Sequence, residues 1–496
     1  MLRRWPIDRL PSPMPMPAAA STPRPARSRR AVCALAALLA VACSAPARAQ
    51  TLLQAFARAQ QHQPQLRGAR AAYAAALQRV PAARARLLPQ ISASAGLADG
   101  LHDETGTPLL RMFGLVTHWN FLQRDVGVDA TQALYAPGDD IAVRQARLAA
   151  EIAYARLARA DQELILAVAQ DYFDLLAARD SVQSLRGEQR ATLRQLQAAH
   201  AQFDAGRGTI VNVRDAQARA DLLAARLIAA RNQRALARDT LQTLIGGRLG
   251  RPAPLLEAAR LPAPAGDAAQ WAARAERDNL QVAQARLALR IARWQVRRTA
   301  SEGLPRVQAY ARVDRLSTSG GGQVFPFGDR IDSASIGVRM QWPLFTGYAL
   351  SSQQREDAAL LDKARQDLEA ARETASLQAR SAFAAWAAAR ARAHALRVAL
   401  RSSGSALQAE RTGFDVGLRV SQDVLDALAR VSDTRREAEQ ARYDQVMQSL
   451  RLKFAAGRLD ERDLAEVDAL LRGGSGEEPG QPGTPRNSPP ASAPAR

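Results

Sequence analysis

Short stretches in which apolar and polar residues alternate occur at two places in the chain, and each place precedes a very long helical pattern. The alternation has the period of two that is typical of β-strands, and it covers residues 91–97, 126–135, 307–314 and 335–344. Residues 98–124 show no clear period and are predicted to form a long loop, as are the glycine-rich residues 319–322. Residues 139–204 and 347–412 contain no proline and are predicted to be helical, the first over a path of about 100 Å.

Each long helix is followed by a turn and then by a second helix. Gly206 and Gly417 lie in these turns, where glycine commonly ends a helix. Two antiparallel helices joined by a tight turn form a coiled-coil hairpin. A shorter helix precedes each pair of strands, over residues 51–88 and 271–301. The chain is therefore expected to contain one structural plan twice.

The two turns also match in sequence, which indicates an internal duplication. Residues 203–219 and 414–430 align without a gap at an offset of 211, and the identical positions are Phe, Asp, Gly, Val and a closing Asp-Ala-x-Ala-Arg. The organisation that follows is a signal peptide (1–49), a first repeat (50–250), a linker (251–267), a second repeat (268–457), a short C-terminal helix (458–472) and a disordered tail (473–496).

The N-terminal segment has the three parts of a secretory signal. A basic cluster at residues 27–30 precedes a short apolar core and the small-x-small site Ala47-Arg48-Ala49. Cleavage after Ala49 removes both cysteines, Cys33 and Cys43. Lipidation of Cys43 is an alternative, although the leucine expected three residues earlier is missing. Because the basic region is long, translation starting at Met14 or Met16 is a further alternative.

Composition and charge exclude several classes of function. The net charge of +20 comes from arginines that are scattered among glutamates and aspartates in helical segments, so no nucleic-acid surface is expected. The five histidines have no metal-ligand spacing, and no phosphate-binding loop or nucleophile motif is present. We therefore expect no enzyme, no metal and no cofactor.

An exported chain with four alternating strands and no long apolar helix fits a membrane β-barrel. Four strands cannot close a barrel with a useful lumen, so closure requires several subunits. The helices are too long for an ordinary globular bundle and are predicted to form a tube that stands off the membrane. A soluble coiled-coil protein with incidental sheets is the alternative, but it does not explain strand pairs at equivalent places in both repeats.

These features resemble the TolC family of outer-membrane channel-tunnels over residues 51–471. The similarity is carried by Leu88-Pro89-Gln90 and Leu304-Pro305, the two Phe-Asp-x-Gly turns, residues 417–427 and Ala441-Arg442-Tyr443. The resemblance implies a mainly α-helical homotrimer with four strands per subunit in one barrel, surrounded by outer-membrane lipid. Its helices form a periplasmic tunnel in a Gram-negative cell. A periplasmic adaptor and an inner-membrane transporter, either an ABC or a proton-driven one, dock at the far end.

Two carboxylates on the second hairpin are candidates for the pore. Asp423 and Asp426 are three residues apart and share one helix face, and three copies place a ring of carboxylates that favours cations around a narrow pore. An ordinary solvated acidic face is the alternative. The resemblance assigns the pair to the periplasmic constriction.

The resemblance also implies a link that keeps the tunnel closed. Its residues are Phe414 and Arg419, with Asn212 at the partner position on the other hairpin. The family's best-known pattern has Tyr and Asp in place of Phe414 and Asn212, so a weaker or differently built link is expected. The hairpin tips around Gly206 and Gly417 are the expected contact with the adaptor or transporter.

The favoured function is the outer-membrane duct of a type I protein secretion system, because many members dedicated to drug efflux are lipoproteins and the lipidation signal here is poor. Multidrug efflux is the main alternative. A periplasmic adaptor is less consistent, since an adaptor has one hairpin and commonly an inner-membrane anchor. A cytosolic nucleic-acid-binding coiled coil is opposed by the signal sequence.

Overall fold

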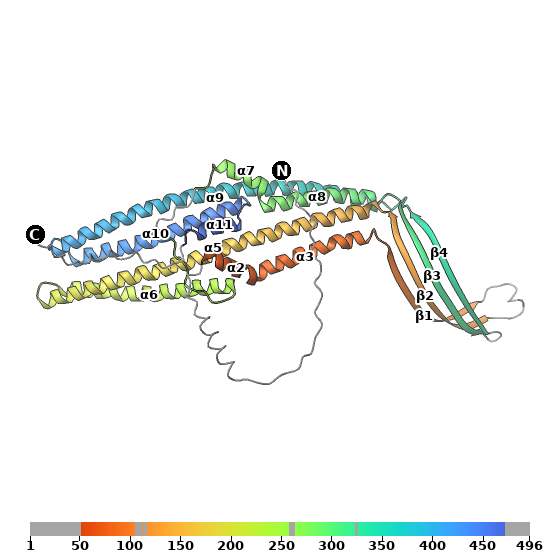
Figure 1. The fold of residues 1–496 in the computed structure, drawn as a ribbon, viewed down its shortest axis with the longest axis horizontal. Coiled ribbons are helices and arrows are strands. Elements are labelled where there is room, and N and C mark those ends of the chain that lie inside the picture. Colours follow the sequence, from red (N-terminus) through yellow and green to blue (C-terminus); the bar gives the residue numbers. More distant parts are fainter. Residues whose placement is uncertain (1–50, 105–111, 113–116, 257–262, 323–325, 472–496) are drawn as a thin grey trace, which may run out of the picture. The chain divides into compact units, whose positions relative to one another are not determined.

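The computed structural model describes residues 51–104, 112, 117–256, 263–322 and 326–471. The predicted signal peptide and the predicted C-terminal tail lie outside these residues. Within the described part, the same order of elements occurs twice (Figure 1). The first set is α2 (Leu52–His62), α3 (Pro64–Ala85), β1 (Gln90–Glu104), β2 (Thr117–Tyr135), α5 (Pro137–Asp204) and α6 (Ile210–Ile245). The second set is α7 (Ala268–Asp278), α8 (Leu280–Ser301), β3 (Arg306–Gly322), β4 (Pro326–Gln341), α9 (Ala349–Asp415) and α10 (Ser421–Ala455), after which α11 (Glu461–Asp468) follows.

The corresponding helices of the two sets have almost the same lengths. The pairs α2 and α7 have 11 residues each, α3 and α8 have 22 each, α5 and α9 have 68 and 67, and α6 and α10 have 36 and 35. Matched lengths of this kind are what the predicted duplication requires, and the duplication itself stays a prediction.

Each of the shorter helices was predicted as one continuous element, and both predictions are wrong. Pro64 begins α3 and holds Gln63 in an extended conformation, so the chain breaks between α2 and α3. Asn279 separates α7 from α8 in the same way. Its side chain accepts a hydrogen bond from the Gln281 amide and donates one to the Ala455 carbonyl, at 2.8 and 2.9 Å.

The four strands form one antiparallel sheet in the order β1-β2-β3-β4. The strands are longer than predicted, because residues 98–104 pair with residues 117–123 and residues 319–322 belong to β3. The glycine run that suggested a loop instead allows close approach of the strands. A Cβ atom at Gly320 would lie 2.5 Å from the Asn120 carbonyl oxygen of β2.

The two faces of the sheet differ in polarity. Strand pairing places Val128 opposite Val313 and Ala311 opposite Ile336, so one face is apolar, whereas Ser92, Asp129 and Arg312 lie on the other. Within the described residues, β1 and β4 each have one edge without a partner strand. Among those same residues, none of the helices has both the length and the apolarity needed to cross a membrane.

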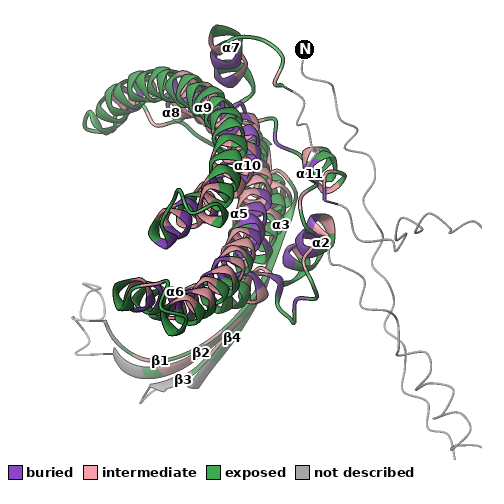
Figure 2. Cartoon of the chain, turned by 90° about the vertical axis from the view of Figure 1, so that its left-hand side faces the viewer, coloured by how far each residue is buried: buried purple, intermediate pink, exposed green. Residues whose placement is uncertain are grey.

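The long helices lie side by side in a curved layer, with α2, α7 and α11 on its convex side (Figure 2). The largest buried cluster forms where α2, α5, α6, α10 and α11 meet, and its fully buried members include Phe56, Ile165, Tyr172, Phe173, Leu241, Leu450 and Leu464. Each such side chain contributes about 1.5–3 kcal/mol when it is buried. The Tyr172 hydroxyl also bonds both the amide and the carbonyl of Ala253, which fixes the start of the predicted linker to α5.

Two glycines offer a test of how α10 is held at its end. Gly457 and Gly206 have nearly the same positive φ, +71° and +70°. Alanine at either position pays roughly 1–2 kcal/mol for the left-handed backbone. At Gly457 alone, the added Cβ would also lie 2.5 Å from the Asp278 carbonyl oxygen, whereas nothing lies within 4 Å at Gly206. We expect Gly457→Ala to lower the midpoint of thermal unfolding, followed by circular dichroism, clearly more than Gly206→Ala does. Equal shifts would contradict this packing of α10 against the α7–α8 junction.

Candidate functional site

The two hairpin turns have the same hydrogen-bonded backbone. The residue after each glycine donates its amide back to a carbonyl in the last helical turn, Arg207 to Gln202 and Leu418 to Gly413, both at 2.8 Å. Each glycine donates to the carbonyl of the phenylalanine three residues before it. This Schellman arrangement needs a left-handed residue, which explains the fixed position of glycine in both Phe-Asp-x-Gly motifs.

The helices that leave the turns begin at matched positions. Thr209 accepts a hydrogen bond from the amide of Asn212 at the start of α6. At the start of α10, the carboxylate of Asp423 accepts one from the amide of Val420, at 3.3 Å. Asn212 and Asp423 are counterparts at the offset of 211, so the predicted partner position and the predicted pore carboxylate have the same place in the two repeats.

Both candidate pore carboxylates have an arginine partner within the chain. Asp426 Oδ1 lies 2.5 Å from Nη2 of Arg219 on α6, and Asp423 Oδ2 lies 3.9 Å from Nη1 of Arg419. The side chains of Asp423 and Asp426 nevertheless remain 38% and 46% exposed, so solvent and ions reach both. Their position in the pore stays a prediction.

The residues expected to form the closing link are not joined as a group within one chain. Arg419 pairs with Glu410 of α9, at 3.3 Å, in addition to Asp423, and both partners belong to the second hairpin. None of the ion pairs of the described residues joins Arg419 to the first hairpin. Phe414 packs against the buried Leu407, Val424 and Ala427 of its own hairpin.

The direct ion pair between the two tips is made by Arg219 and Asp426 instead. Arg219 is not among the residues predicted from the sequence, although the sequence contains a signal for it. Arg219 closes the repeated Asp-Ala-x-Ala-Arg motif and has a positive charge four residues after an aspartate.

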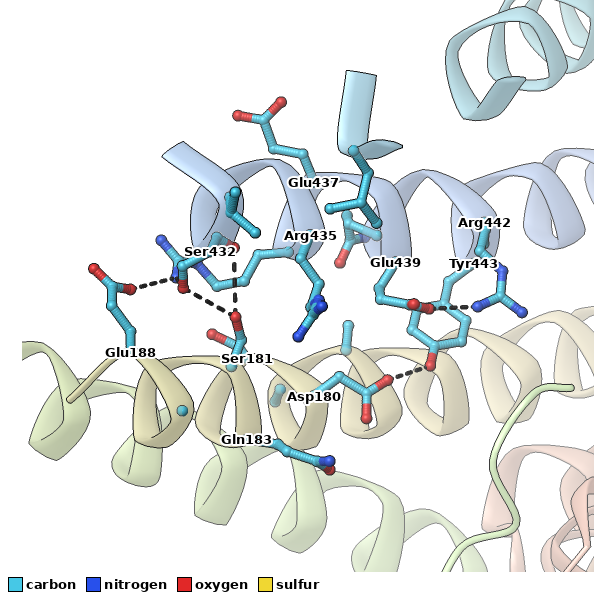
Figure 3. A pocket seen from close by; sticks show the side chains of 18 of the residues that line it. Asp180, Ser181, Gln183, Glu188, Ser432, Arg435, Glu437, Glu439, Arg442 and Tyr443 are labelled. Atoms are coloured by element: carbon cyan, nitrogen blue, oxygen red, sulfur yellow. Dashed lines mark hydrogen bonds and ion pairs between the residues drawn. The ribbon is translucent and has the colours of Figure 1, made fainter. Parts of the chain in front are cut away.

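Behind the tips, the two hairpins pack through α5 and α10 and enclose a groove of about 1550 Å³ (Figure 3). Polar contacts cross this junction at intervals. They are Gln195–Ser421 at 2.8 Å, Glu188–Arg436 at 3.4 Å, Ser184–Ser432 at 3.1 Å and Asp180–Tyr443 at 2.5 Å. Glu188 is buried, so its pairing with Arg436 is essential to avoid an uncompensated buried charge.

Burial in this groove changes the proton affinity of several groups. It raises the pKa of Asp171 to about 6, with a further contribution from the nearby Asp174 charge. Burial likewise raises the pKa of Asp174 and of Asp180, and in Asp180 the hydrogen bond from Tyr443 opposes the shift. Within the described ranges, no group of three or more His, Cys, Asp or Glu side chains is arranged to hold a metal ion.

The raised pKa of Asp171 predicts a pH-dependent loss of stability. The folded state binds the proton more tightly than the unfolded state, so this contribution is complete below about pH 4 and is lost as the pH rises to about 6. Asp171→Asn keeps a neutral group at all pH values. We expect the variant to unfold at a higher temperature than wild type at pH 7.5 and at the same temperature near pH 4. Asp239→Asn, at an exposed position on α6, is the control, and an equal response of both variants would contradict the assignment.

Comparison with known proteins identifies the family of this chain. The family model described as "Outer membrane efflux protein" matches residues 55–247 and 271–458. The chain is 30% identical to the outer membrane protein TolC of Vibrio cholerae over 86% of this chain and 94% of that protein. It is also 30% identical to the alkaline protease secretion protein AprF of Pseudomonas aeruginosa, over 64% of this chain and 66% of the relative.

A solved structure shows the same fold at lower identity. The outer membrane protein VceC from Vibrio cholerae superimposes with a TM-score of 0.66 and 19% identity, over 82% of this chain and 96% of VceC. The expected resemblance and the expected location are thus confirmed: the chain belongs to the outer membrane efflux protein family, the family of TolC, and is an outer-membrane protein.

Proposed function

We propose that three copies of this chain form the outer-membrane duct of a tripartite export system, with a barrel in the membrane and a helical tunnel in the periplasm. The observation that carries the proposal is a four-stranded sheet with two open edges whose strands continue directly into two long helical hairpins. Open edges present unpaired amide and carbonyl groups, which copies of the same sheet can satisfy by closing a ring.

The apolar face of the sheet has the height that a membrane requires. On β4 and the residue that follows it, this face shows Ala334, Ile336, Val338, Met340 and Trp342. Eight residue steps along a strand cover about 26 Å before tilt, close to the apolar band of about 25 Å in outer-membrane barrels. The exposed ion pair Arg315–Asp332 follows at one end of the stripe, and Trp342 stands at the other, where aromatic residues favour the interface.

The helical part supports a tunnel built from several chains. The packing of α5 against α10 joins the two hairpins within one chain and leaves α6 and α9 as the outer flanks. These flanks expose large apolar side chains, Leu222, Ile228 and Leu236 on α6 and Leu377 and Val398 on α9. Neighbouring copies that set α9 against α6 would cover both.

For the cargo we favour protein secretion by a type I system. The relative AprF is named for the secretion of alkaline protease, which supports this choice. Multidrug efflux is the second candidate, since the matching family is described by efflux. In either case an adaptor and an inner-membrane transporter would meet the tips, where Val416, Leu418 and Ile210 are exposed apolar residues.

The first test concerns the duct and its constriction. We expect the protein, reconstituted in planar bilayers, to form cation-selective channels that a trivalent cation blocks. Asp423→Ala combined with Asp426→Ala should weaken the block at least about tenfold, because each lost charge-assisted contact is worth on the order of 1.4 kcal/mol. Asp239→Ala, far from the tips on α6, should leave the block unchanged. Equal block of all three proteins would place the pair outside the pore, and trimers that stay without conductance even when Arg419→Ser is added would contradict the duct itself.

The second test concerns the closed state. Arg419 ties the end of α9 to the start of α10 through Glu410 and Asp423, and its side chain lies directly over Gly413. Arg419→Ser removes both ion pairs, so we expect a severalfold larger single-channel conductance. Arg401→Ser is the matched control on an exposed part of α9. A conductance that stays at the wild-type value would show that Arg419 does not hold the tunnel closed.

A further inference from the structure

The ion pair between the tips joins the two copies of one repeated motif. Arg219 closes the motif at residues 215–219, and Asp426 opens the motif at residues 426–430. In each copy the aspartate and the arginine are four residues apart on one helix face. The pair therefore uses one charge from each motif.

The other charge of each motif has no ion-pair partner among the described residues. These charges are Asp215 on α6, which is partly exposed, and Arg430 on α10, which is exposed. The offset of 211 makes Asp215 the counterpart of Asp426 and Arg430 the counterpart of Arg219. The chain therefore has one more aspartate and one more arginine that could form an ion pair of the same kind as Arg219–Asp426.

The packing of the hairpins shows where these two charges can meet. Within the chain, α5 contacts α10, and α6 approaches α10 at the tips. The repeat relation exchanges α5 for α9 and α6 for α10. Suppose that the first hairpin of a second copy packs beside the second hairpin of this chain in the same way that the second hairpin packs beside the first. Then α9 contacts α6 of the second copy, and α10 approaches the same α6. These are the flanks that the single chain leaves uncovered.

We propose that Arg430 forms an ion pair with Asp215 of a neighbouring copy of this chain. With three copies, the pairs Arg219–Asp426 and Arg430–Asp215 alternate around the tips, the first within a chain and the second between chains. The inference rests on the proposed trimer and adds the residues that join its subunits at the tips.

Two of the polar contacts between the α5 and α10 helices of one chain are not repeated between chains. At the same offset, Ser184 and Glu188 of α5 correspond to Ala395 and Ala399 of α9. The junction between chains therefore lacks the hydrogen bond and the buried ion pair that these α5 residues make to α10. Unlike these two contacts, the Asp–Arg pair has matching charges at both kinds of junction, so it can contribute to the specificity of the subunit contact at the tips.

Thiol cross-linking tests the contact directly. Both native cysteines precede residue 50, so cysteines placed at two later positions are the only thiols in residues 51–496. Asp215→Cys with Arg430→Cys, treated with a short bis-maleimide in detergent, should give covalently linked trimers on a denaturing gel. Arg219→Cys with Asp426→Cys calibrates the reagent, because it should lose both thiols by mass while the chain stays a monomer on the gel. Asp239→Cys with Arg430→Cys should remain unlinked.

Light scattering on the same samples separates the two proposals. Trimers whose 215 and 430 positions do not cross-link, although the calibrating pair does, would overturn the Arg430–Asp215 contact and leave the proposed duct intact. Monomers would overturn the proposed trimer.

As a second measurement, Asp215→Arg and Arg430→Asp should each lower the temperature at which the trimer dissociates, and the two changes together should restore it. Failure of the combined variant to recover would also overturn the contact.

Discussion

The contact between α5 and α10 is the constraint on which the arrangement of the chain depends. It buries Tyr172, Phe173 and Tyr443 in one cluster and fixes the angle between the two hairpins through hydrogen bonds such as that from Tyr443 to Asp180. The first hairpin also packs against α8 through α5. Because α5 continues from β2 and α8 leads into β3, the two strand pairs meet in one sheet. The α5–α10 contact also determines which helices remain uncovered, and therefore which surfaces a second chain can contact.

Much of this fold follows from patterns that are local in the sequence. Proline-free tracts between glycines predict the long helices, and a left-handed glycine is required wherever a helix reverses in so few residues. The lengths of the strands could not be predicted in this way. Residues 98–104 and 319–322 have little strand propensity of their own, and they join the sheet because neighbouring strands supply their hydrogen-bond partners. The break at Asn279 likewise depends on a carbonyl of α10 that lies far away in the sequence.

In the candidate site, too, some features follow from the local sequence and others depend on the packing of the helices. Spacing along one helix made Asp423 and Asp426 candidates, since residues three apart share a face, and the resemblance assigned them to the constriction. Their partners depend on which helices are neighbours. Arg419 turns toward its own hairpin, and the bond across the tips goes to Arg219, which is on a different helix of the other repeat. Sequence patterns identify charges that need partners, and only the packing of the hairpins selects among them.

The matched lengths of α5 and α9, 68 and 67 residues, have a consequence for how such a chain can change in evolution. Both helices connect the same sheet to the same level of tips, and each added residue moves a tip by about 1.5 Å and turns it by about 100°. An insertion in one hairpin alone would misalign Arg219 and Asp426 and rotate apolar positions out of the α5–α10 contact. A change of length keeps the tips level and the packed faces nearly aligned when it adds about seven residues to each helix of both hairpins, so the distance that the helices span changes as one coordinated trait.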